Sequence, residues 1–223
     1  MIFTLDGIDG SGKSTFARRL AAALDAERVP SVIIHIDDFR REVDWRRGPS
    51  EAEVYYQRYY DLGLCERALQ AFAAGEPGFT VPRYDAATEC VVGTKRLEFA
   101  GAKVAIVEGV FTQRVPSAAA GFILYLDVGY QCAEARILER DQQKGRSRAE
   151  IERRIHERYF PCQERYHAAF GPRERADVVI ANEDIPFARR RDLARLPGPL
   201  RQVVDGLVPT CQNLDTSSGS QSA

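Results

Sequence analysis

Residues 7–14 read Gly-Ile-Asp-Gly-Ser-Gly-Lys-Ser, which matches the pattern G-x-x-x-x-G-K-[ST] of a phosphate-binding loop. The three glycines let the backbone curl so that its N–H groups face an anion, in conformations that a side chain would obstruct. Lys13 supplies a positive charge for the β- and γ-phosphates of a nucleoside triphosphate, and Ser14 offers a hydroxyl to Mg²⁺. The loop predicts a nucleoside triphosphate with Mg²⁺, bound by Gly7, Asp9, Gly10, Ser11, Gly12, Lys13, Ser14 and Thr15.

The segments beside the loop have the order that this motif requires. Residues 2–5 form a short strand-like run and residues 15–24 are helix-prone, so the loop joins a strand to a helix whose N-terminus faces the phosphates. Helix-compatible stretches separate most of the further strand-like runs. These runs lie at 31–36, 104–107, 122–126 and 178–181. The alternation predicts an α/β fold, a P-loop NTPase-type parallel sheet with helices on both faces.

The length, composition and net charge of the chain indicate a soluble protein with one domain. A chain of 223 residues suits one α/β domain, and 44% hydrophobic with 28% charged residues is typical of a soluble globular protein. The net charge of −1 indicates no general nucleic-acid surface. The five cysteines are scattered and form no C-x-x-C pair, which predicts reduced thiols. The sequence has no apolar run long enough to span a membrane and no signal-peptide pattern, so we expect a cytoplasmic protein.

Four further segments have their own patterns. Residues 51–74 are expected to be largely helical, and β-branched and aromatic residues at 79–99 predict a small antiparallel insertion beside the nucleotide site. Two charged helices are expected at 130–144 and 147–170. Residues 1–208 are thus expected to form a single P-loop domain, and the polar residues 209–223 to form a disordered tail.

An acidic pair follows the second strand-like run, in the sequence His35-Ile36-Asp37-Asp38-Phe39. Ligands of open α/β sheets bind at the carboxyl ends of strands, so this pair is expected to face the γ-phosphate. A carboxylate there accepts a proton from an attacking hydroxyl, an effect worth about 10²–10⁴-fold in rate. We predict Asp37 to be the catalytic base and a Mg²⁺ partner, and Asp38 to bind substrate, with helix capping as the alternative for one of them.

A second acid, Glu108, directly follows the apolar run at 104–107. This is where a second carboxylate on the Mg²⁺ side belongs, often acting through water. We therefore predict a metal site formed by Ser14, Asp37 and Glu108, with Glu108 also reaching the substrate. The alternative is a surface Glu that ends the strand.

Three arginines lie beyond the fourth core strand. Arg136 and Arg140 share one helical face at i and i+4, and Arg146 follows Gly145. Arginines on a lid can close over a triphosphate and stabilise charge on the transferring group. The pattern predicts a helical lid in which Arg140 and Arg146 are catalytic and Arg136 binds the nucleotide.

A second group of arginines has a different pattern. Arg153, Arg154 and Arg158 alternate with glutamates between residues 150 and 157. Such alternation indicates an ion-paired face exposed to solvent.

Together these residues resemble the uridine kinase-like branch of the P-loop kinases, which includes phosphoribulokinase, pantothenate kinase and nicotinamide riboside kinase. The resemblance extends over about residues 1–185. Its motifs are Gly7–Ser14, Asp37-Asp38-Phe39, Pro82-Arg83-Tyr84-Asp85, Val107-Glu108-Gly109, Arg140-Asp141 with Gly145-Arg146, and Ala176-Asp177-Val178-Val179-Ile180. It implies that Asp37 is the base, that Tyr84 lies at the acceptor site and that Glu108 is the acid near Mg²⁺. The lid arginines match approximately, because their spacing is one residue shorter.

Two departures from that family bear on the substrate. Glu89 occupies the place where uridine–cytidine kinases have a His that reads the pyrimidine, and the His-Pro-Asp segment that holds the ribose is missing. Nearby, Trp45 and the tyrosines of the run Tyr55-Tyr56-Gln57-Arg58-Tyr59-Tyr60 can stack on a ring. Arg46, Arg47 and Arg58 can bind an anionic or carbonyl-bearing group. The alternative is that the tyrosines pack a helix onto the sheet and the arginines are solvated. A rebuilt pocket favours an unusual nucleoside, including a nucleoside antibiotic.

The sequence thus predicts an ATP- and Mg²⁺-dependent phosphotransferase with an alcohol acceptor, acting on a nucleoside or nucleoside-like small molecule. A kinase of another hydroxy metabolite and a nucleoside monophosphate kinase stay open, although the Asp-Arg-Tyr segment of thymidylate kinases is absent. A regulatory NTPase acting on a protein partner is disfavoured, because neither Asn-Lys-x-Asp nor a Leu-Ser-Gly-Gly-type signature occurs. The related kinases vary in assembly, so a homo-oligomer stays open.

Overall fold

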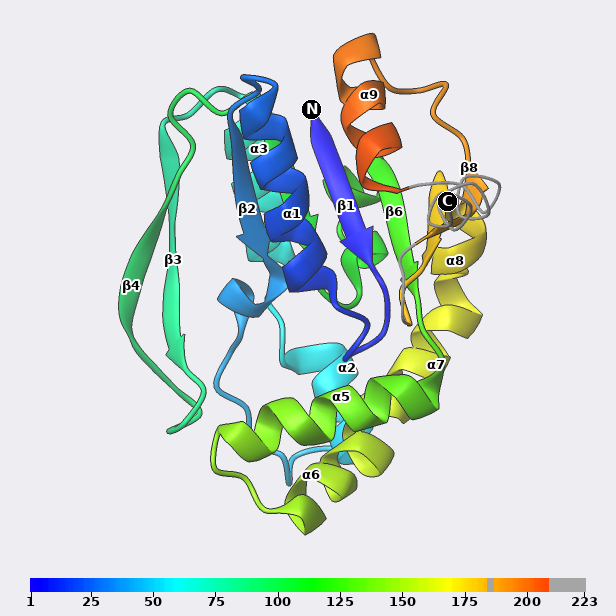
Figure 1. Cartoon of the computed structure of the whole chain (residues 1–223). Helices are drawn as coiled ribbons and strands as arrows, with labels where there is room; N and C mark the ends of the chain where they lie inside the picture. The colour runs from blue at the N-terminus through cyan, green and yellow to red at the C-terminus, as the bar shows by residue number, and fades with distance from the viewer. Residues whose placement is uncertain (184–186, 209–223) are drawn as a thin grey trace, which may run out of the picture.

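The structure is a computed structural model that describes residues 1–183 and 187–208, without the side chains of 187–191. Within these residues, a six-stranded sheet has the order β2-β5-β1-β6-β7-β8 (Figure 1). Neighbours from β2 to β7 pair in parallel, and β8 pairs with β7 in the antiparallel direction. The strands are β1 (Ile2–Asp6), β2 (Ser31–His35), β5 (Val104–Glu108), β6 (Phe122–Asp127), β7 (Val178–Ala181) and β8 (Phe187–Arg191). The predicted parallel sheet is confirmed; β8 was not expected.

Helices cover both faces of the sheet (Figure 1). One face packs against α1 (Lys13–Ala26) and α9 (Gly198–Leu207). The other packs against α2 (Glu51–Arg58), α3 (Leu62–Ala73), α4 (Pro116–Ala119) and α7 (Phe160–Phe170). Every residue of β5 is buried, and its alternate side chains enter the two opposite cores. This is the pattern of a parallel strand covered on both sides.

The predicted insertion is an antiparallel hairpin of β3 (Gly78–Asp85) and β4 (Cys90–Glu98). It stands beside β2, and its turn lies at the end of the molecule where α5 (Tyr130–Gln143) and α6 (Arg148–Arg154) are found (Figure 1). The strands of the main sheet also end on this side. The hairpin therefore brings its turn to the carboxyl edge of the sheet, where α/β proteins bind ligands.

The predicted helix at 51–74 is divided in two. Ser50 caps α2 by accepting a hydrogen bond from the Glu53 N–H, and Asp61 caps α3 by accepting one from the Leu64 N–H at 2.8 Å. Side-chain caps satisfy amide groups that a helix start leaves without partners. The break places Tyr59 and Tyr60 in a turn beside the carboxyl ends of the strands.

The predicted helix at 147–170 contains an irregular turn. A π-helical segment (η3, Ile155–Tyr159) joins α6 to α7, and α8 (Pro172–Arg175) follows. A π turn changes which side chains of a helix share a face, and such turns are frequent at functional sites. Across the described ranges 1–183 and 187–208, no helix combines the length and apolarity needed to cross a membrane. The predicted disordered tail at 209–223 lies outside the described residues.

Candidate active site

The phosphate-binding loop joins β1 to α1 and borders a cavity of about 420 Å³. Gly10 and Gly12 have φ angles of +77° and +91°, in the left-handed region that glycine adopts without strain. A Cβ on Gly10 would lie 2.5 Å from the carbonyl oxygen of Ala133 in α5, so the loop and the lid helix approach closely because this residue has no side chain. The cavity is lined by Asp9, Gly10, Gly12, Lys13, Ser14, Thr15, Arg18, Asp37, Tyr60, Glu108, Gly109, Val110, Arg136 and Arg140.

Lys13 begins α1 and is almost fully buried. Its ammonium group donates hydrogen bonds to the carbonyl oxygens of Gly7 and Ile8, at 3.0 and 2.7 Å. The charge is therefore held inside the curl of the loop. There, together with the N–H groups of the α1 start, it can neutralise phosphate oxygens.

The side chains of Ser14, His35 and Glu108 meet near the ends of β1, β2 and β5. Ser14 Oγ donates to Glu108 Oε1 at 3.0 Å, and His35 Nδ1 contacts the same carboxylate oxygen. Burial opposes ionisation of Glu108, but the His35 hydrogen bond and the Lys13 charge outweigh it and lower its pKa. Glu108 is thus kept as a carboxylate. A hydroxyl and a carboxylate side by side are hard oxygen ligands, which suit Mg²⁺ shared with phosphates.

Asp37 lies in a 3-10 turn (η1, Ile36–Phe39) directly after β2. Tyr60 donates to its Oδ1 at 3.1 Å, and Arg40 binds its Oδ2. Its side chain is about half exposed, at 56%. Asp37 borders both the 420 Å³ cavity and a second one of about 190 Å³. The carboxylate is thus oriented by two donors and stands where the two cavities meet.

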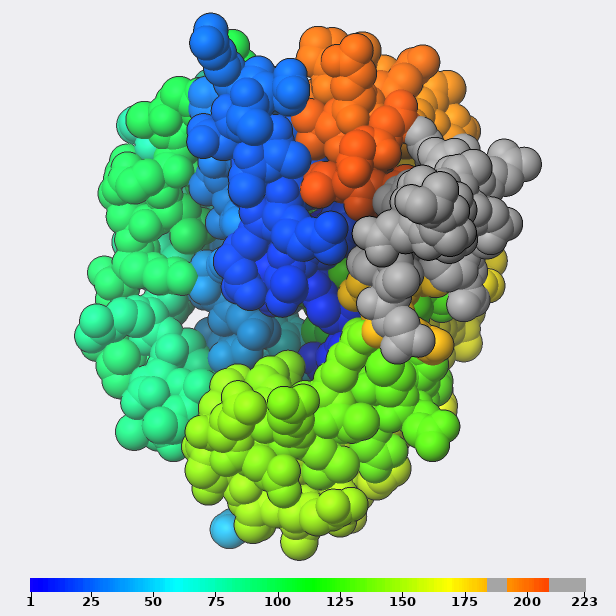
Figure 2. Space-filling model, viewed as in Figure 1, coloured from blue at the N-terminus to red at the C-terminus, as the bar shows by residue number. Residues whose placement is uncertain are grey.

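The second cavity lies between the turn of the β3–β4 hairpin and the helices α5 and α6. It is lined by Asp9, Asp37, Arg40, Tyr55, Tyr59, Tyr60, Ala86, Glu89, Arg140, Asp141, Lys144, Arg146, Arg154, Arg158 and Tyr159. Asp9, Asp37, Tyr60 and Arg140 border both cavities, and we call the smaller one the acceptor cavity. Figure 2 shows that the surface is hollowed where α5 faces the ends of β1 and β2.

A row of polar contacts lies behind the junction of the cavities. The hydroxyls of Tyr55 and Tyr60 are 3.0 Å apart, and Tyr55 also donates to Asp9 Oδ2 at 3.5 Å. Gln163 of α7 donates to the same Asp9 oxygen at 2.7 Å. Burial raises the pKa of Asp9 in spite of the nearby Lys13 and Arg140. This loop residue is therefore tied to the wall of the acceptor cavity as well as to the nucleotide site.

The three lid arginines occupy different places. Arg136 borders the nucleotide cavity and an adjoining recess that it shares with Gly12, Thr15, Phe16, Arg19 and Asn182. Arg140 borders both main cavities, and Arg146 borders the acceptor cavity without bordering the nucleotide cavity. Asp141, which is buried, pairs with both Arg140 and Arg146.

Of the residues predicted to bind substrate, Glu89 lines the acceptor cavity and Glu108 the nucleotide cavity. Trp45 stands behind this wall, where its indole N–H donates to Glu89 at 2.9 Å and Arg158 covers its ring at 3.5 Å. Tyr84 packs against Tyr59 and lines neither cavity.

The other three predicted substrate residues lie outside both cavities. Asp38 pairs with Lys95 of β4 at 2.5 Å, because its side chain points from η1 toward the hairpin. Tyr56 is buried between the guanidinium groups of Arg114 and Arg165. Arg46 is exposed on the surface.

The prediction of a solvent-exposed face for the second group of arginines was wrong for two of them. Arg154 and Arg158 do pair with glutamates, but their side chains are only 16% and 4% exposed, and both line the acceptor cavity. Glu51 of α2 holds Arg158 on the inner side of the helix, and Glu89 of the hairpin turn holds Arg154 there. Tyr55, Tyr59 and Tyr60, which were among the tyrosines expected to stack on a ring, line the acceptor cavity. Residues missed by the sequence reasoning include Arg40 and Tyr159. For Arg40, the position directly after Asp37-Asp38-Phe39 was an available signal.

Both a family model and solved structures match this chain. The model of the phosphoribulokinase/uridine kinase family matches residues 2–183. A structure described as that of a possible uridine kinase from Bacillus stearothermophilus is 26% identical with a TM-score of 0.64, and the match covers 80% of this chain and 87% of that one. No curated protein matches the chain.

A second solved structure shares the fold. It comes from Silicibacter sp. TM1040 and is provisionally described as a fructose transport system kinase. It is 22% identical with a TM-score of 0.61, over 75% of this chain and 84% of that one. The family match covers most of the chain and includes the loop, Asp37, Glu108 and the lid. The chain therefore belongs to the phosphoribulokinase/uridine kinase family and is a small-molecule kinase.

Proposed function

We propose that this kinase transfers the γ-phosphoryl group of ATP to a hydroxyl group of a nucleoside or a nucleoside-like small molecule. The observation that carries the proposal is the position of Asp37, a carboxylate bordering both the nucleotide cavity and the acceptor cavity. A base at that junction can reach an acceptor hydroxyl while the hydroxyl oxygen faces the γ-phosphorus. Orientation of this kind is a main source of rate acceleration in phosphoryl transfer.

In the proposed reaction the acceptor oxygen forms a bond to the γ-phosphorus, and the bond from that phosphorus to the β,γ-bridging oxygen breaks. The hydroxyl proton passes to Asp37, and ADP leaves. Lys13 and Arg140 neutralise charge on the phosphate oxygens as the bond order changes. Tyr60 and Arg40 hold the two Asp37 oxygens in place, so the carboxylate need not reorient.

The residues present fit a magnesium ion on the phosphate side of the site. Ser14 and Glu108 would hold it, and Asp37 borders the same cavity. Mg²⁺ is usually bound by one or two protein oxygens together with substrate phosphates, which matches this donor set. When bound, the ion would neutralise phosphate charge and orient the γ-phosphoryl group.

The tyrosines support a ring-bearing acceptor. Tyr55, Tyr59 and Tyr159 line the acceptor cavity, and aromatic walls bind flat rings by offset or edge contacts. The similarity to a protein described as a possible uridine kinase points in the same direction. Glu89, whose carboxylate is held by Trp45 and Arg154, supports an acceptor other than plain uridine.

A coupled ADP-release assay tests the proposal. The full chain is incubated with Mg-ATP and a panel of nucleosides, nucleoside antibiotics, nucleoside monophosphates and non-nucleoside hydroxy compounds. We expect one nucleoside-like class to stimulate ADP release. In Asp37→Asn the stimulated rate should fall by about 10²–10⁴-fold. The matched control is Asp44→Asn, which changes an exposed acid that lines neither cavity.

Other outcomes identify the competing functions. Turnover of nucleoside monophosphates to nucleoside diphosphates, in which the new phosphoryl group is attached to the existing phosphate, would replace the proposal with a nucleoside monophosphate kinase. Stimulation only by non-nucleoside compounds would leave a kinase of another hydroxy metabolite. Steady ATP hydrolysis that ignores every acceptor and survives Asp37→Asn would contradict the kinase reaction and favour a regulatory NTPase.

A further inference from the structure

Cationic side chains outnumber carboxylates in the lining of the acceptor cavity. Among the described residues, six cations and four carboxylates border it: Arg40, Arg140, Lys144, Arg146, Arg154 and Arg158 against Asp9, Asp37, Glu89 and Asp141. Burial raises the pKa of Asp9. A neutral acceptor gives no reason for such a lining, because unpaired charge near a cavity is costly unless something compensates it.

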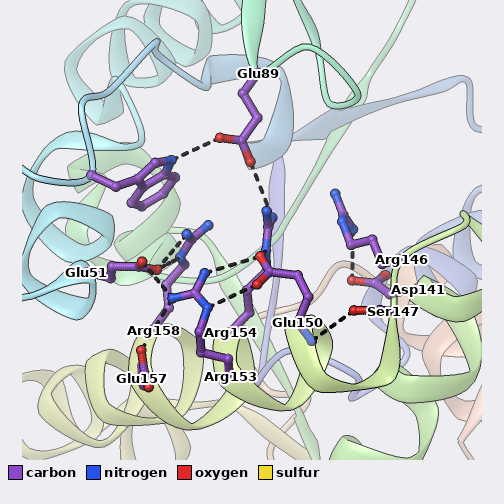
Figure 3. A network of polar contacts seen from close by, with 11 residues as sticks. Glu51, Glu89, Asp141, Arg146, Ser147, Glu150, Arg153, Arg154, Glu157 and Arg158 are labelled. Atoms are coloured by element: carbon purple, nitrogen blue, oxygen red, sulfur yellow. Dashed lines mark hydrogen bonds and ion pairs between the residues drawn. The ribbon is translucent and has the colours of Figure 1, made fainter.

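Three of these six cations pair with carboxylates other than Asp141. Arg40 pairs with Asp37. Arg154 pairs with Glu150 at 2.5 Å and with Glu89 at 3.3 Å, and Arg158 pairs with Glu51 at 2.6 Å. Figure 3 shows the pairs of Arg154 and Arg158 as a continuous network, joined through Arg153, from the hairpin turn to α6 and α2. This part of the wall is close to neutral and is held rigidly.

The remaining three cations of the acceptor cavity lie around Asp141. Arg140 binds its Oδ1 at 2.7 Å and Arg146 its Oδ2 at 3.0 Å, while the Lys144 ammonium lies 3.7 Å from Oδ1. The Asp141 side chain is only 2% exposed. Burial opposes its ionisation, but the hydrogen bond and charge of Arg140, with the charges of Lys144 and Arg146, lower its pKa. One carboxylate thus faces three cations, and Asp9 adds a second negative charge near Arg140. Cations therefore outnumber carboxylates in this part of the lining.

The position of two of these cations separates them from the ATP site. Arg140 borders both cavities, whereas Lys144 and Arg146 border the acceptor cavity without bordering the nucleotide cavity. Their side chains are 59% and 25% exposed, so a ligand in the cavity can reach them. An anion bound there would belong to the acceptor, since the triphosphate cavity lies on the other side of Asp37 and Arg140.

We propose that the acceptor carries an anionic group, a phosphate monoester or a carboxylate, which binds Lys144 and Arg146 away from the hydroxyl that faces Asp37. This inference rests on the proposed function and specifies its substrate class. It transfers the anion-binding role from Arg46, which is exposed, to the segment between α5 and α6. A guanidinium and an ammonium that bind the same anion donate charge-assisted hydrogen bonds to it, and these are stronger than hydrogen bonds between neutral groups.

The first test measures binding and needs no turnover. The full chain, saturated with Mg²⁺ and a non-hydrolysable ATP analogue, is titrated with inorganic phosphate and separately with acetate. Heat and the fluorescence of Trp45, the single tryptophan, report binding. Lys144→Gln and Arg146→Gln should each weaken phosphate binding by about 10–100-fold, the effect of one lost charge-assisted hydrogen bond. Arg148→Gln, in which a 69% exposed charge is removed, should bind phosphate like the parent.

The second test uses matched acceptors in the ADP-release assay: a nucleoside and its 5′-monophosphate, a nucleoside and its 5′-carboxylate, and glycerol with glycerate and glycerol 3-phosphate. We expect the anionic members to have the lower KM, and Lys144→Gln to abolish that preference. Comparison of the KM values of the phosphate and carboxylate acceptors then shows which of the two anionic groups the site binds.

The two proposals fail in different ways. If neutral acceptors are preferred, or if phosphate binds equally to Lys144→Gln, Arg146→Gln and Arg148→Gln, the anionic substrate class is wrong while the kinase reaction stands. If no acceptor stimulates ADP release but phosphate binding depends on Lys144 and Arg146, the anion site stands and the proposed phosphoryl transfer falls.

Discussion

The hydroxyl of Tyr60 donates a hydrogen bond to Oδ1 of Asp37, with 3.1 Å between the two oxygens. The same hydroxyl lies 3.0 Å from that of Tyr55, which in turn reaches Asp9 in the phosphate-binding loop. Burial raises the pKa of both tyrosines well above the ordinary value, so they stay protonated and act as donors. Each phenol has one proton, which Tyr60 directs to Asp37 and Tyr55 to Asp9. The two hydroxyls thus lie side by side between the candidate base and the loop.

Replacing Tyr60 by Phe should lower kcat by about tenfold, because it removes one of the two donors that orient Asp37, and a hydrogen bond to a charged group is worth about 1.5–3 kcal/mol. The affinity for ATP should change little. Steady-state kinetics with the stimulating acceptor and a separate ATP-binding titration measure the two effects. Tyr125→Phe removes a hydroxyl bound to His167 outside the cavities and serves as the control. Equal losses in both variants would contradict the orienting role.

Gly10→Ala should weaken ATP binding and lower the free energy of unfolding. The new Cβ would lie 2.5 Å from the Ala133 carbonyl oxygen, in addition to the cost of a left-handed residue. Gly101→Ala is a matched control, because Gly101 has a φ of +76° and no atom within 4 Å of its added Cβ. Denaturant unfolding should show Gly10→Ala to be less stable than Gly101→Ala by about 1–3 kcal/mol. A difference near zero would show that α5 moves away freely.

Asp141→Asn should destabilise the protein by about 3 kcal/mol, since it leaves three cations around a buried position without their carboxylate. The change preserves the size of the side chain, so packing contributes little to the loss. Urea unfolding of this variant is compared with that of Asp25→Asn, in which an exposed acid of α1 is replaced. The acceptor KM should also rise, because Arg146 loses the partner that holds it at the cavity. A stable Asp141→Asn protein with an unchanged KM would show that Arg146 is positioned by other contacts.

His35 predicts a pH dependence of stability. Its hydrogen bond to Glu108 raises its pKa above the ordinary 6.5, in spite of partial burial. The stabilisation from this pair is fully present below about pH 6.5, the value in the unfolded chain, and is lost as the pH rises through the higher folded value. The Tm measured without Mg²⁺ should therefore fall across this window, and His35→Gln should flatten the fall. His156→Gln, a change at an exposed imidazole, should retain it. A parallel pH profile in His35→Gln would contradict this origin.

Several parts of the fold could be predicted because they depend on local pattern. The glycine spacing of residues 7–14 has few backbone solutions, and the buried run of β5 is apolar throughout because both faces of that strand are covered. β8 and α9 were missed. The π turn at 155–159 was also missed, because it interrupts a helix whose sequence continues the helical pattern on both sides.

The candidate site also has one half that could be predicted from the sequence and one half that could not. The nucleotide half lies within contiguous motifs, so its members could be named from the chain: Lys13 and Ser14 in the loop, and Asp37 and Glu108 at strand ends. The acceptor half is assembled from the hairpin turn, α2, α5, α6 and η3, and no motif spans them. Asp38 shows the consequence. It adjoins Asp37 in sequence, but a turn of the 3-10 helix directs it to Lys95 instead.

By itself, the sequence determined the parallel sheet, the loop and the carboxylates at the strand ends, because each follows from residues near one another in the chain. Only the tertiary structure decided which charges face the acceptor. Arg154 and Arg158 follow a surface-like pattern of alternating charge, yet packing against α2 and the hairpin turns them inward. The rotation of a helix about its axis depends on contacts distant in sequence, and that rotation determines which of its charges enters a cavity.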